Sequence, residues 1–319
     1  MIKSFFASRK WMWWAYLGGA FLLASLYAQV YMSVMINDWY RGFYDILQKA
    51  TEHEVSELWD SLLLFMYIAM PYVLLATVTA YFTRLYAFRW REAITFNYVN
   101  RWNPVNEIEG SAQRIQQDTE RFAKIMESLG LQVIRAIMTL VAFLPVLWTL
   151  SEDIKVPLLP EFMSDGSLVW VAIITSLGGL LISWKVGCKL PGLEYNNQKV
   201  EAAYRQNLEL VSTHKLDFSL LTITELFTGL KFNYHRLFLH YGYFDIWLNL
   251  YDQFMVIIPY MVAGSGLFTG AITLGVIIQI SNAFQKVHGS FSLFIFNWTT
   301  ITELRSVIKR LKEFEGKLD

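Results

Sequence analysis

Six stretches of about 20 mostly apolar residues limit most strongly how this chain can fold. A helix of about 20 residues crosses a hydrocarbon core about 30 Å thick. The stretches cover residues 11–36, 61–83, 129–150, 167–187, 241–263 and 271–298. The last stretch is the weakest, because Lys286 and His288 interrupt it. The pattern predicts an all-α polytopic membrane protein with six transmembrane helices.

The composition supports a bilayer as the natural solvent. Hydrophobic residues make up 55% of the chain and charged residues 17%, against about 25% charged residues in an average soluble protein. This abundance of apolar groups argues against a disordered chain, and the single Cys188 argues against a disulfide framework. The net charge of zero gives no support to a nucleic-acid partner.

The distribution of basic residues predicts the orientation. Residues 37–60 contain six acids and two bases, residues 151–166 contain four acids and one base, and residues 264–270 contain no charge. The other 24 bases fall in the N-terminus, in the segments from Arg84 to Arg135 and from Lys185 to Arg236, and in the tail from Lys286 onward. Basic residues mark the cytoplasmic side, so both termini are expected in the cytoplasm. A cleaved signal peptide at the N-terminus is the competing interpretation; we expect an uncleaved span, because the first apolar stretch is too long.

The two long connections have a helical pattern. Residues 110–130 and 193–211 are expected to extend the spans into the cytoplasm as helices. In the first of them, five apolar side chains fall on one stripe at helical spacing: Ile115, Phe122, Ile125, Met126 and Leu129. Charged pairs across one turn, Asp118 with Arg121 and Glu120 with Lys124, are expected to support the same helix.

Six spans with long cytoplasmic extensions after the second and fourth are the pattern of one half of an ABC-exporter membrane domain, an analogy of fold alone. It implies one transmembrane transporter domain over residues 1–319 and an intertwined homodimer. No phosphate-binding loop of the form G-x-x-x-x-G-K-[ST] occurs, so no nucleotide-binding domain is expected. Either a separate subunit supplies an ATPase, or an ion gradient drives transport.

No motif for catalysis or for metal binding is present in the sequence. The five histidines are scattered, and one cysteine cannot form a zinc cluster. No G-x-S-x-G nucleophile motif occurs. We therefore expect no enzyme activity, no cofactor and no metal.

Ionisable residues inside apolar spans are candidate functional groups, because a charge in hydrocarbon costs at least about 2.5 kcal/mol. Asp245 and Asp252 lie seven residues apart and share one face of the fifth predicted span. Arg135, Lys286 and His288 are possible partners in the third and sixth. The alternative, equally weighted, is that these groups pair with one another inside a bundle.

Glu127 and Glu201 each lie in a cytoplasmic extension near a predicted membrane boundary. Partial loss of water there would favour protonation of a carboxylate, so that it could bind and release protons. On local sequence alone, a solvated helix face is the favoured alternative for both residues.

Specific motifs give the chain a resemblance to a known family. They are NDWYRGFYDILQKA (37–50), FRWREAITFNYVNRW (88–102), EIEGSAQRIQQDTERFAKIMESLG (107–130), IMTLVAFLPVL (137–147), KLPGLEYNNQKVEAAYR (189–205), GAITLGVIIQISNAF (270–284) and NWTTITEL (297–304). The chain resembles the SbmA/BacA family of peptide-antibiotic transporters. The resemblance implies a homodimer in the bacterial inner membrane with an ABC-exporter-like fold, which imports antimicrobial peptides, microcins and bleomycin-type glycopeptides with protons as the coupling ion.

The resemblance also implies which carboxylates handle protons. Matching acids are Glu127, Glu201, Glu109, Glu194, Glu303, Asp118 and Glu209. The chain departs from the family pattern in three ways. Gln117 stands where an acid is expected, and an acidic run of the family is reduced to Glu209. The chain also starts close to the first core span, without the family's additional N-terminal spans. Import by alternating access is thus the expected function. The alternatives are the membrane subunit of an ATP-driven transporter with a separately encoded ATPase, and a non-transporting receptor or assembly factor.

Overall fold

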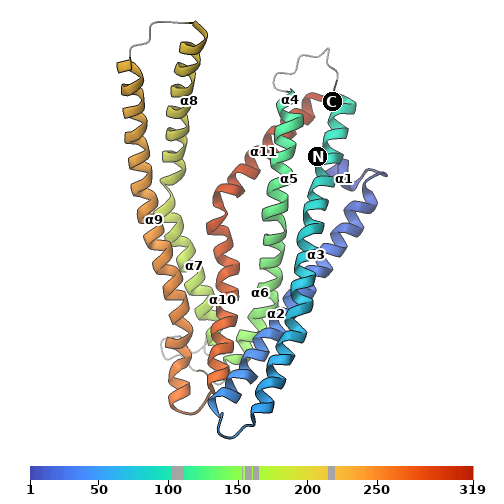
Figure 1. Ribbon diagram of the computed structural model, residues 1–319, viewed down its shortest axis with the longest axis vertical. Helices are drawn as coiled ribbons and strands as arrows, with labels where there is room; N and C mark the ends of the chain where they lie inside the picture. Colours follow the sequence, from blue (N-terminus) through green and yellow to red (C-terminus); the bar gives the residue numbers. More distant parts are fainter. Residues whose placement is uncertain (103–110, 153, 155–159, 161–164, 215–219, 319) are drawn as a thin grey trace. The chain divides into compact units, whose positions relative to one another are not determined.

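The computed structural model describes residues 1–102, 111–152, 154, 160, 165–214 and 220–318, with the backbone alone at 210–214 and 220–223. Every regular element in these ranges is a helix (Figure 1). Five helical segments are long and apolar enough to cross a membrane. They are Met12–Gln48, Val55–Arg101, Ser111–Leu150, Ser167–Glu209 and Thr224–Phe268. The prediction of an all-α polytopic membrane protein is therefore confirmed.

The helices follow one another with short breaks, and two of them, η1 and η2, are single π-helical turns. In chain order they are α1 (Ile2–Phe6), α2 (Met12–Gln48), α3 (Val55–Arg101), α4 (Ser111–Gln113), η1 (Arg114–Asp118), α5 (Thr119–Ile125), η2 (Met126–Gly130), α6 (Leu131–Leu150), α7 (Ser167–Gly187), α8 (Leu190–His214), α9 (Leu220–Phe268), α10 (Leu274–Phe296) and α11 (Trp298–Leu318). The two predicted helical extensions are confirmed, because residues 111–130 and 190–214 are helical.

The sixth predicted span lies on α10, which is not among the five most apolar helical segments. Polar side chains along this helix, such as Gln279, Gln285 and Lys286, lower its apolar character. The number of spans therefore stays a prediction.

The connection between α2 and α3 is short. The predicted apolar stretches end at residue 36 and resume at residue 61, but α2 continues to Gln48 and α3 begins at Val55. A capping box starts α3, in which the backbone N–H of Glu54 donates to Glu57 over 3.3 Å. The acidic residues of this segment thus lie mostly on helix ends rather than on a loop.

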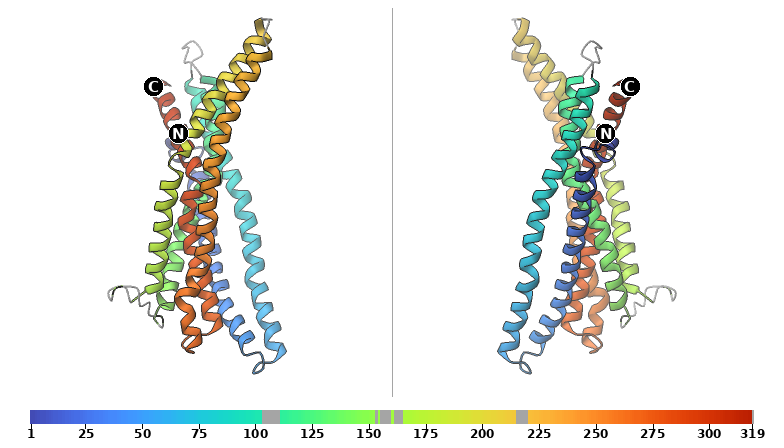
Figure 2. Two further views of the ribbon diagram at one scale, coloured as in Figure 1. Left: turned by 90° about the vertical axis from the view of Figure 1, so that its left-hand side faces the viewer. Right: turned by 90° about the vertical axis from the view of Figure 1, so that its right-hand side faces the viewer.

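The chain divides into two units, and the first comprises Met1–Ile173 and Ile258–Asp319. In this unit α2 packs against α3, α6 and α10, and α6 also packs against α10. Close approach of α2 and α3 is possible because Gly18 faces the ring of Tyr86. The Tyr86 hydroxyl donates to the carbonyl oxygen of Ala15 over 3.0 Å. Figure 2 shows α2 and α3 side by side from two directions.

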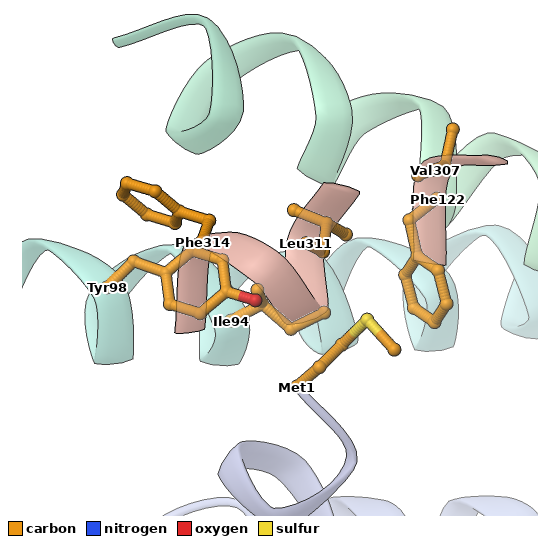
Figure 3. Packing of buried hydrophobic residues seen from close by; sticks show 7 residues of the cluster. All are labelled: Met1, Ile94, Tyr98, Phe122, Val307, Leu311 and Phe314. Carbon is orange, nitrogen blue, oxygen red and sulfur yellow. The ribbon is translucent and has the colours of Figure 1, made fainter. Parts of the chain in front are cut away.

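At the end of the first unit that contains both termini, α3, α5 and α11 enclose a buried apolar cluster, the α3–α5–α11 cluster (Figure 3). Its buried members are Met1, Ile94, Tyr98, Phe122, Val307, Leu311 and Phe314. Ile115 and Met126 pack against it, and Ile125 and Leu129 are also buried. The predicted apolar stripe of residues 110–130 is therefore confirmed. It packs against α3 and the C-terminal helix α11.

The second unit comprises Ile174–Ile257 and contains most of α7, all of α8 and most of α9. Trp247 on α9 donates its indole N–H to the Ser183 hydroxyl on α7 over 2.8 Å. Tyr251 lies beside Gly179, where a side chain would collide with its ring. These contacts join α7 to α9 through small residues on one helix and aromatic residues on the other.

Candidate functional site

A chain of polar side chains crosses the apolar helix bundle of the first unit. Arg135 on α6 donates from Nη2 to Oε1 of Gln29 on α2 over 2.8 Å. Gln29 in turn donates from Nε2 to Oγ1 of Thr79 on α3 over 2.8 Å. Gln29 and Thr79 are 2% and 1% exposed, so their hydrogen bonds hold the guanidinium of Arg135 in one place.

Lys286 on α10 is a second cation near Arg135, and the two side chains interact electrostatically. Arg135 and Lys286 lie at similar distances from the end of the bundle where α6 ends and α10 begins. Arg135 is 15 residues from the end of α6 at Leu150, and Lys286 is 12 residues from the start of α10 at Leu274. At 1.5 Å per residue these separations are about 22 Å and 18 Å. Since those two helix ends lie at the same end of the bundle (Figure 1), both cations lie well inside it.

Side-chain carboxylates and an amide on the last part of α2 form hydrogen bonds with the start of α10. Asp38 accepts a hydrogen bond from Gln279 over 2.6 Å, and Asp45 accepts one from the backbone N–H of Gly275 over 3.0 Å. The backbone N–H of Leu274 donates to the Gln48 side chain over 2.8 Å. A Cβ at Gly275 would collide with the backbone of Arg41, so this close contact requires glycine.

The two cations have no carboxylate partner in the first unit, as far as the described residues show. Each retains exposed surface on the isolated chain. An Arg or Lys at the centre of a membrane helix costs about 2.5–3.5 kcal/mol on insertion scales, and such residues face a bundle interior or a water-filled cavity. The exposed faces of Arg135 and Lys286 therefore require water or protein rather than lipid. Two cations so placed can bind an anion.

His288, the other charged candidate on α10, has a different environment. Its side chain is 6% exposed, and its imidazole lies 3.3 Å from the hydroxyl of Ser292 one turn away. Because His288 is buried among its neighbours, it is not part of the exposed face that Lys286 presents.

Asp118, Glu127 and Glu303 lie near the terminal end of the first unit, and each has an arginine partner. Glu127 is 3.5 Å from Nε of Arg84, and its side chain is 39% exposed. Glu303 is 3.6 Å from Arg121. Both carboxylates are thus ion-paired groups near the surface.

Asp118 is the most buried of these candidates, with a side chain 3% exposed. It accepts hydrogen bonds from Arg114 over 2.8 Å and from Nη2 of Arg310 on α11 over 2.8 Å. The hydrogen bond to Asp118 holds the pKa of Arg310 above its usual range. The predicted pair of Asp118 with Arg121 is wrong, because α11 brings Arg310 closer. The predicted pair of Glu120 with Lys124 is confirmed at 2.8 Å.

The remaining described candidates lie in the second unit. Glu201 on α8 accepts a hydrogen bond from the Tyr234 hydroxyl on α9 over 2.9 Å. Glu209 lies 3.6 Å from Arg205 and is 69% exposed, while Glu194 is half-buried. On α9, Asp245 is exposed and Asp252 is half-buried. Glu109 lies outside the described residues, so its role stays a prediction.

In the ranges that the structure describes, no three His, Cys, Asp or Glu side chains are grouped to hold a metal ion. Cys188 is exposed, and its thiol contacts the carbonyl oxygen of Lys185 over 3.1 Å. The expectations on metals and cofactors stay predictions.

Sequence reasoning missed the uncharged polar residues of the site. Gln29, Thr79 and Gln279 are polar side chains inside stretches chosen for being apolar, and each is buried. A buried side-chain amide needs hydrogen-bond partners, so an isolated Gln in such a stretch is a usable signal. The search for ionisable groups alone could not find it.

Comparison with known proteins identifies relatives over nearly the whole length. A family model described as the SbmA/BacA-like family matches residues 8–319. The chain is 28% identical over 317 residues to the inner membrane ABC transporter ATP-binding protein YddA of Escherichia coli, with 92% of this chain and 55% of that protein aligned. It is 23% identical over 331 residues to an uncharacterised ABC transporter ATP-binding protein of Synechocystis, with 98% and 47% aligned.

A plant protein is also similar. The chloroplastic ABC transporter D family member 2 of Arabidopsis thaliana is 25% identical over 310 residues, with 90% of this chain and 41% of that protein aligned. The chain thus spans about half the length of the curated relatives that it matches.

Proposed function

Because this chain belongs to the SbmA/BacA-like family, we propose that it is the membrane domain of a homodimeric transporter. It imports peptides and peptide-like antibiotics, including antimicrobial peptides, microcins and bleomycin-type glycopeptides. The location is the bacterial inner membrane, in agreement with the name of the relative YddA. Both termini are cytoplasmic, as the distribution of basic residues suggests.

The observation that most supports a transport pathway is the polar chain from Thr79 through Gln29 to Arg135, with Lys286 nearby. A bundle that only anchored a protein in lipid would gain nothing from two cations at this depth. A bundle that encloses a water-filled path can hydrate both of them. The dimer supplies the second wall of such a path in the ABC-exporter-like arrangement.

We propose protons as the coupling ion, with Glu127 and Glu201 as the groups to test first. In this structure each carboxylate is held by a partner, Arg84 and Tyr234 respectively. In alternating access, a second conformation would separate each carboxylate from its partner. There the loss of the partner and of water would favour the protonated form of the carboxylate. A difference in proton affinity between two states lets a pH gradient bias their populations.

The test uses the purified chain in sealed liposomes with a labelled proline-rich peptide outside. An imposed gradient, acidic outside, is expected to drive uptake, and a protonophore is expected to abolish it. Glu127→Gln and Glu201→Gln are each expected to lower uptake at least about tenfold, whereas Glu313→Gln on α11, whose side chain is 60% exposed and lies outside the candidate set, is the matched control. Full uptake by the double variant Glu127→Gln/Glu201→Gln would contradict the proton assignment.

An ATP-driven transporter is the second candidate, because the relatives are named ABC transporter ATP-binding proteins. In that case this membrane part works with an ATPase. Uptake that needs ATP and a nucleotide-binding partner, and that ignores the pH gradient, would establish this candidate. A receptor or assembly factor, the third alternative, would give no flux under either condition.

A further inference from the structure

We infer that Arg135 and Lys286 form a binding site for a carboxylate group of the transported molecule, and specifically for the free C-terminal carboxylate of a peptide. This assignment deepens the proposed function and rests on it. It gives the two cations of the proposed pathway a specific ligand group.

The geometry of Arg135 suits a carboxylate. Nη2 of the guanidinium donates a hydrogen bond to Oε1 of the buried Gln29 over 2.8 Å, and Gln29 is itself bonded to Thr79. Arginine has five N–H donors in a rigid fork. Arg135 is exposed as a residue, and among the described residues its side-chain hydrogen bond is the one to Gln29. A guanidinium fixed in this way can donate two parallel hydrogen bonds to one carboxylate. Lys286 adds a second, more mobile charge that does not require one orientation.

An anion would also balance the two positive charges of Arg135 and Lys286 inside the bundle. Arg135 and Lys286 repel each other, and in the described part of the first unit neither has an ion pair with an acid. The acids that reach α10 in this unit, Asp38 and Asp45, bind near its start. Gln279, the partner of Asp38, precedes Lys286 by seven residues, a distance of about 10 Å along the helix. Asp38 and Asp45 therefore bind groups near the start of α10 rather than the two cations.

The experiment compares two peptides of identical sequence, one with a free C-terminal carboxylate and one with a C-terminal carboxamide. The purified full chain is placed in lipid nanodiscs, and the affinity for each fluorescent peptide is measured by anisotropy. We expect the carboxylate peptide to bind at least about tenfold more tightly, as hydrogen bonds to an ionised group are worth about 1.5–3 kcal/mol.

Substitutions test which residues cause the preference for the carboxylate peptide. Arg135→Gln and Lys286→Gln are each expected to remove most of the preference for the carboxylate, because they weaken binding of the carboxylate peptide more than binding of the carboxamide peptide. Arg135→Lys is expected to restore only part of it, because the fork is lost. Arg205→Gln, an exposed arginine on α8 with a side chain 80% exposed, is the matched control and should keep the full preference. If Arg135→Gln fails to fold, Lys286→Gln alone decides the outcome.

Three results would overturn the assignment. The first is equal affinity for the two peptides, which leaves the proposed transport function in place. The second is a preference that survives in Arg135→Gln/Lys286→Gln. The third is strong thermodynamic coupling of Arg135 or Lys286 with Asp245 or Asp252 in double-mutant cycles without ligand, which would show that the cations serve internal ion pairs. If neither peptide binds and neither is transported, the proposed function itself fails, and the assignment fails with it.

Discussion

Replacing Asp118 with asparagine is expected to loosen α11 from the α3–α5–α11 cluster. The carboxylate is 3% exposed and accepts hydrogen bonds from Arg114 and from both Nε and Nη2 of Arg310, over 2.8–3.0 Å. An asparagine side chain has one oxygen instead of two and turns an amide N–H₂ toward a guanidinium. Two arginines are then left without their counter-charge.

The magnitude follows from the burial of the three side chains. Removing one partner of a buried ion pair costs about 3–5 kcal/mol. Arg114 and Arg310 are 30% and 29% exposed, so they regain some water, and we expect about 2–4 kcal/mol. At roughly 2–4 °C per kcal/mol for a chain of this order of size, the midpoint of thermal unfolding should fall by about 4–16 °C.

The assay is thermal unfolding in detergent, followed by tryptophan fluorescence, with limited trypsin digestion to report exposure of α11. Glu303→Gln is the matched control, because this glutamate is 45% exposed and lies 3.6 Å from its arginine. Such a surface pair is worth at most about 1 kcal/mol. An unchanged unfolding midpoint in Asp118→Asn, or no coupling between Asp118→Asn and Arg310→Ala in a double-mutant cycle, would refute this reasoning.

Three further predictions address packing and the polar chain. Phe122→Ala removes a side chain that is 2% exposed and should cost about 3–5 kcal/mol, measured as a lower thermal unfolding midpoint. Gly179→Ala should reduce the folded yield in size-exclusion chromatography, because its methyl group meets the ring of Tyr251, whereas Gly178→Ala has open space and should behave as the parent. Gln29→Ala removes the anchor of the α6 guanidinium and should reduce the preference for carboxylate over carboxamide peptides at least about threefold by anisotropy.

The transmembrane architecture could be predicted because hydrophobicity is a local property. Most of each apolar stretch lies in a helix, and the stripe that includes Phe122 is buried in the α3–α5–α11 cluster. The lengths of the helices were harder to predict. The end of α2 contains Asp38, Arg41 and Asp45, so a search for uninterrupted apolar residues stops before the helix ends at Gln48.

Spacing predicts ion pairs within one helix, such as Glu120 with Lys124, but it could not predict the pairs between helices that are distant in the sequence. Asp118 has Arg121 three residues away in the sequence, yet it pairs with Arg310, which lies 192 residues further along the chain. Helical periodicity reports neighbours within one or two turns, whereas α11 returns to α5 only in the tertiary fold. The same limit applies to Arg135 and Gln29, which are 106 residues apart.

We propose that this chain moves peptides through the membrane on a proton gradient. The most direct measurement is the uptake of a labelled peptide into sealed liposomes that contain only this chain, with acid outside, no ATP and no ATPase. We expect uptake that increases with the gradient and stops when a protonophore is added. No uptake under the gradient, or uptake that begins only when ATP and a nucleotide-binding subunit are supplied, would contradict it.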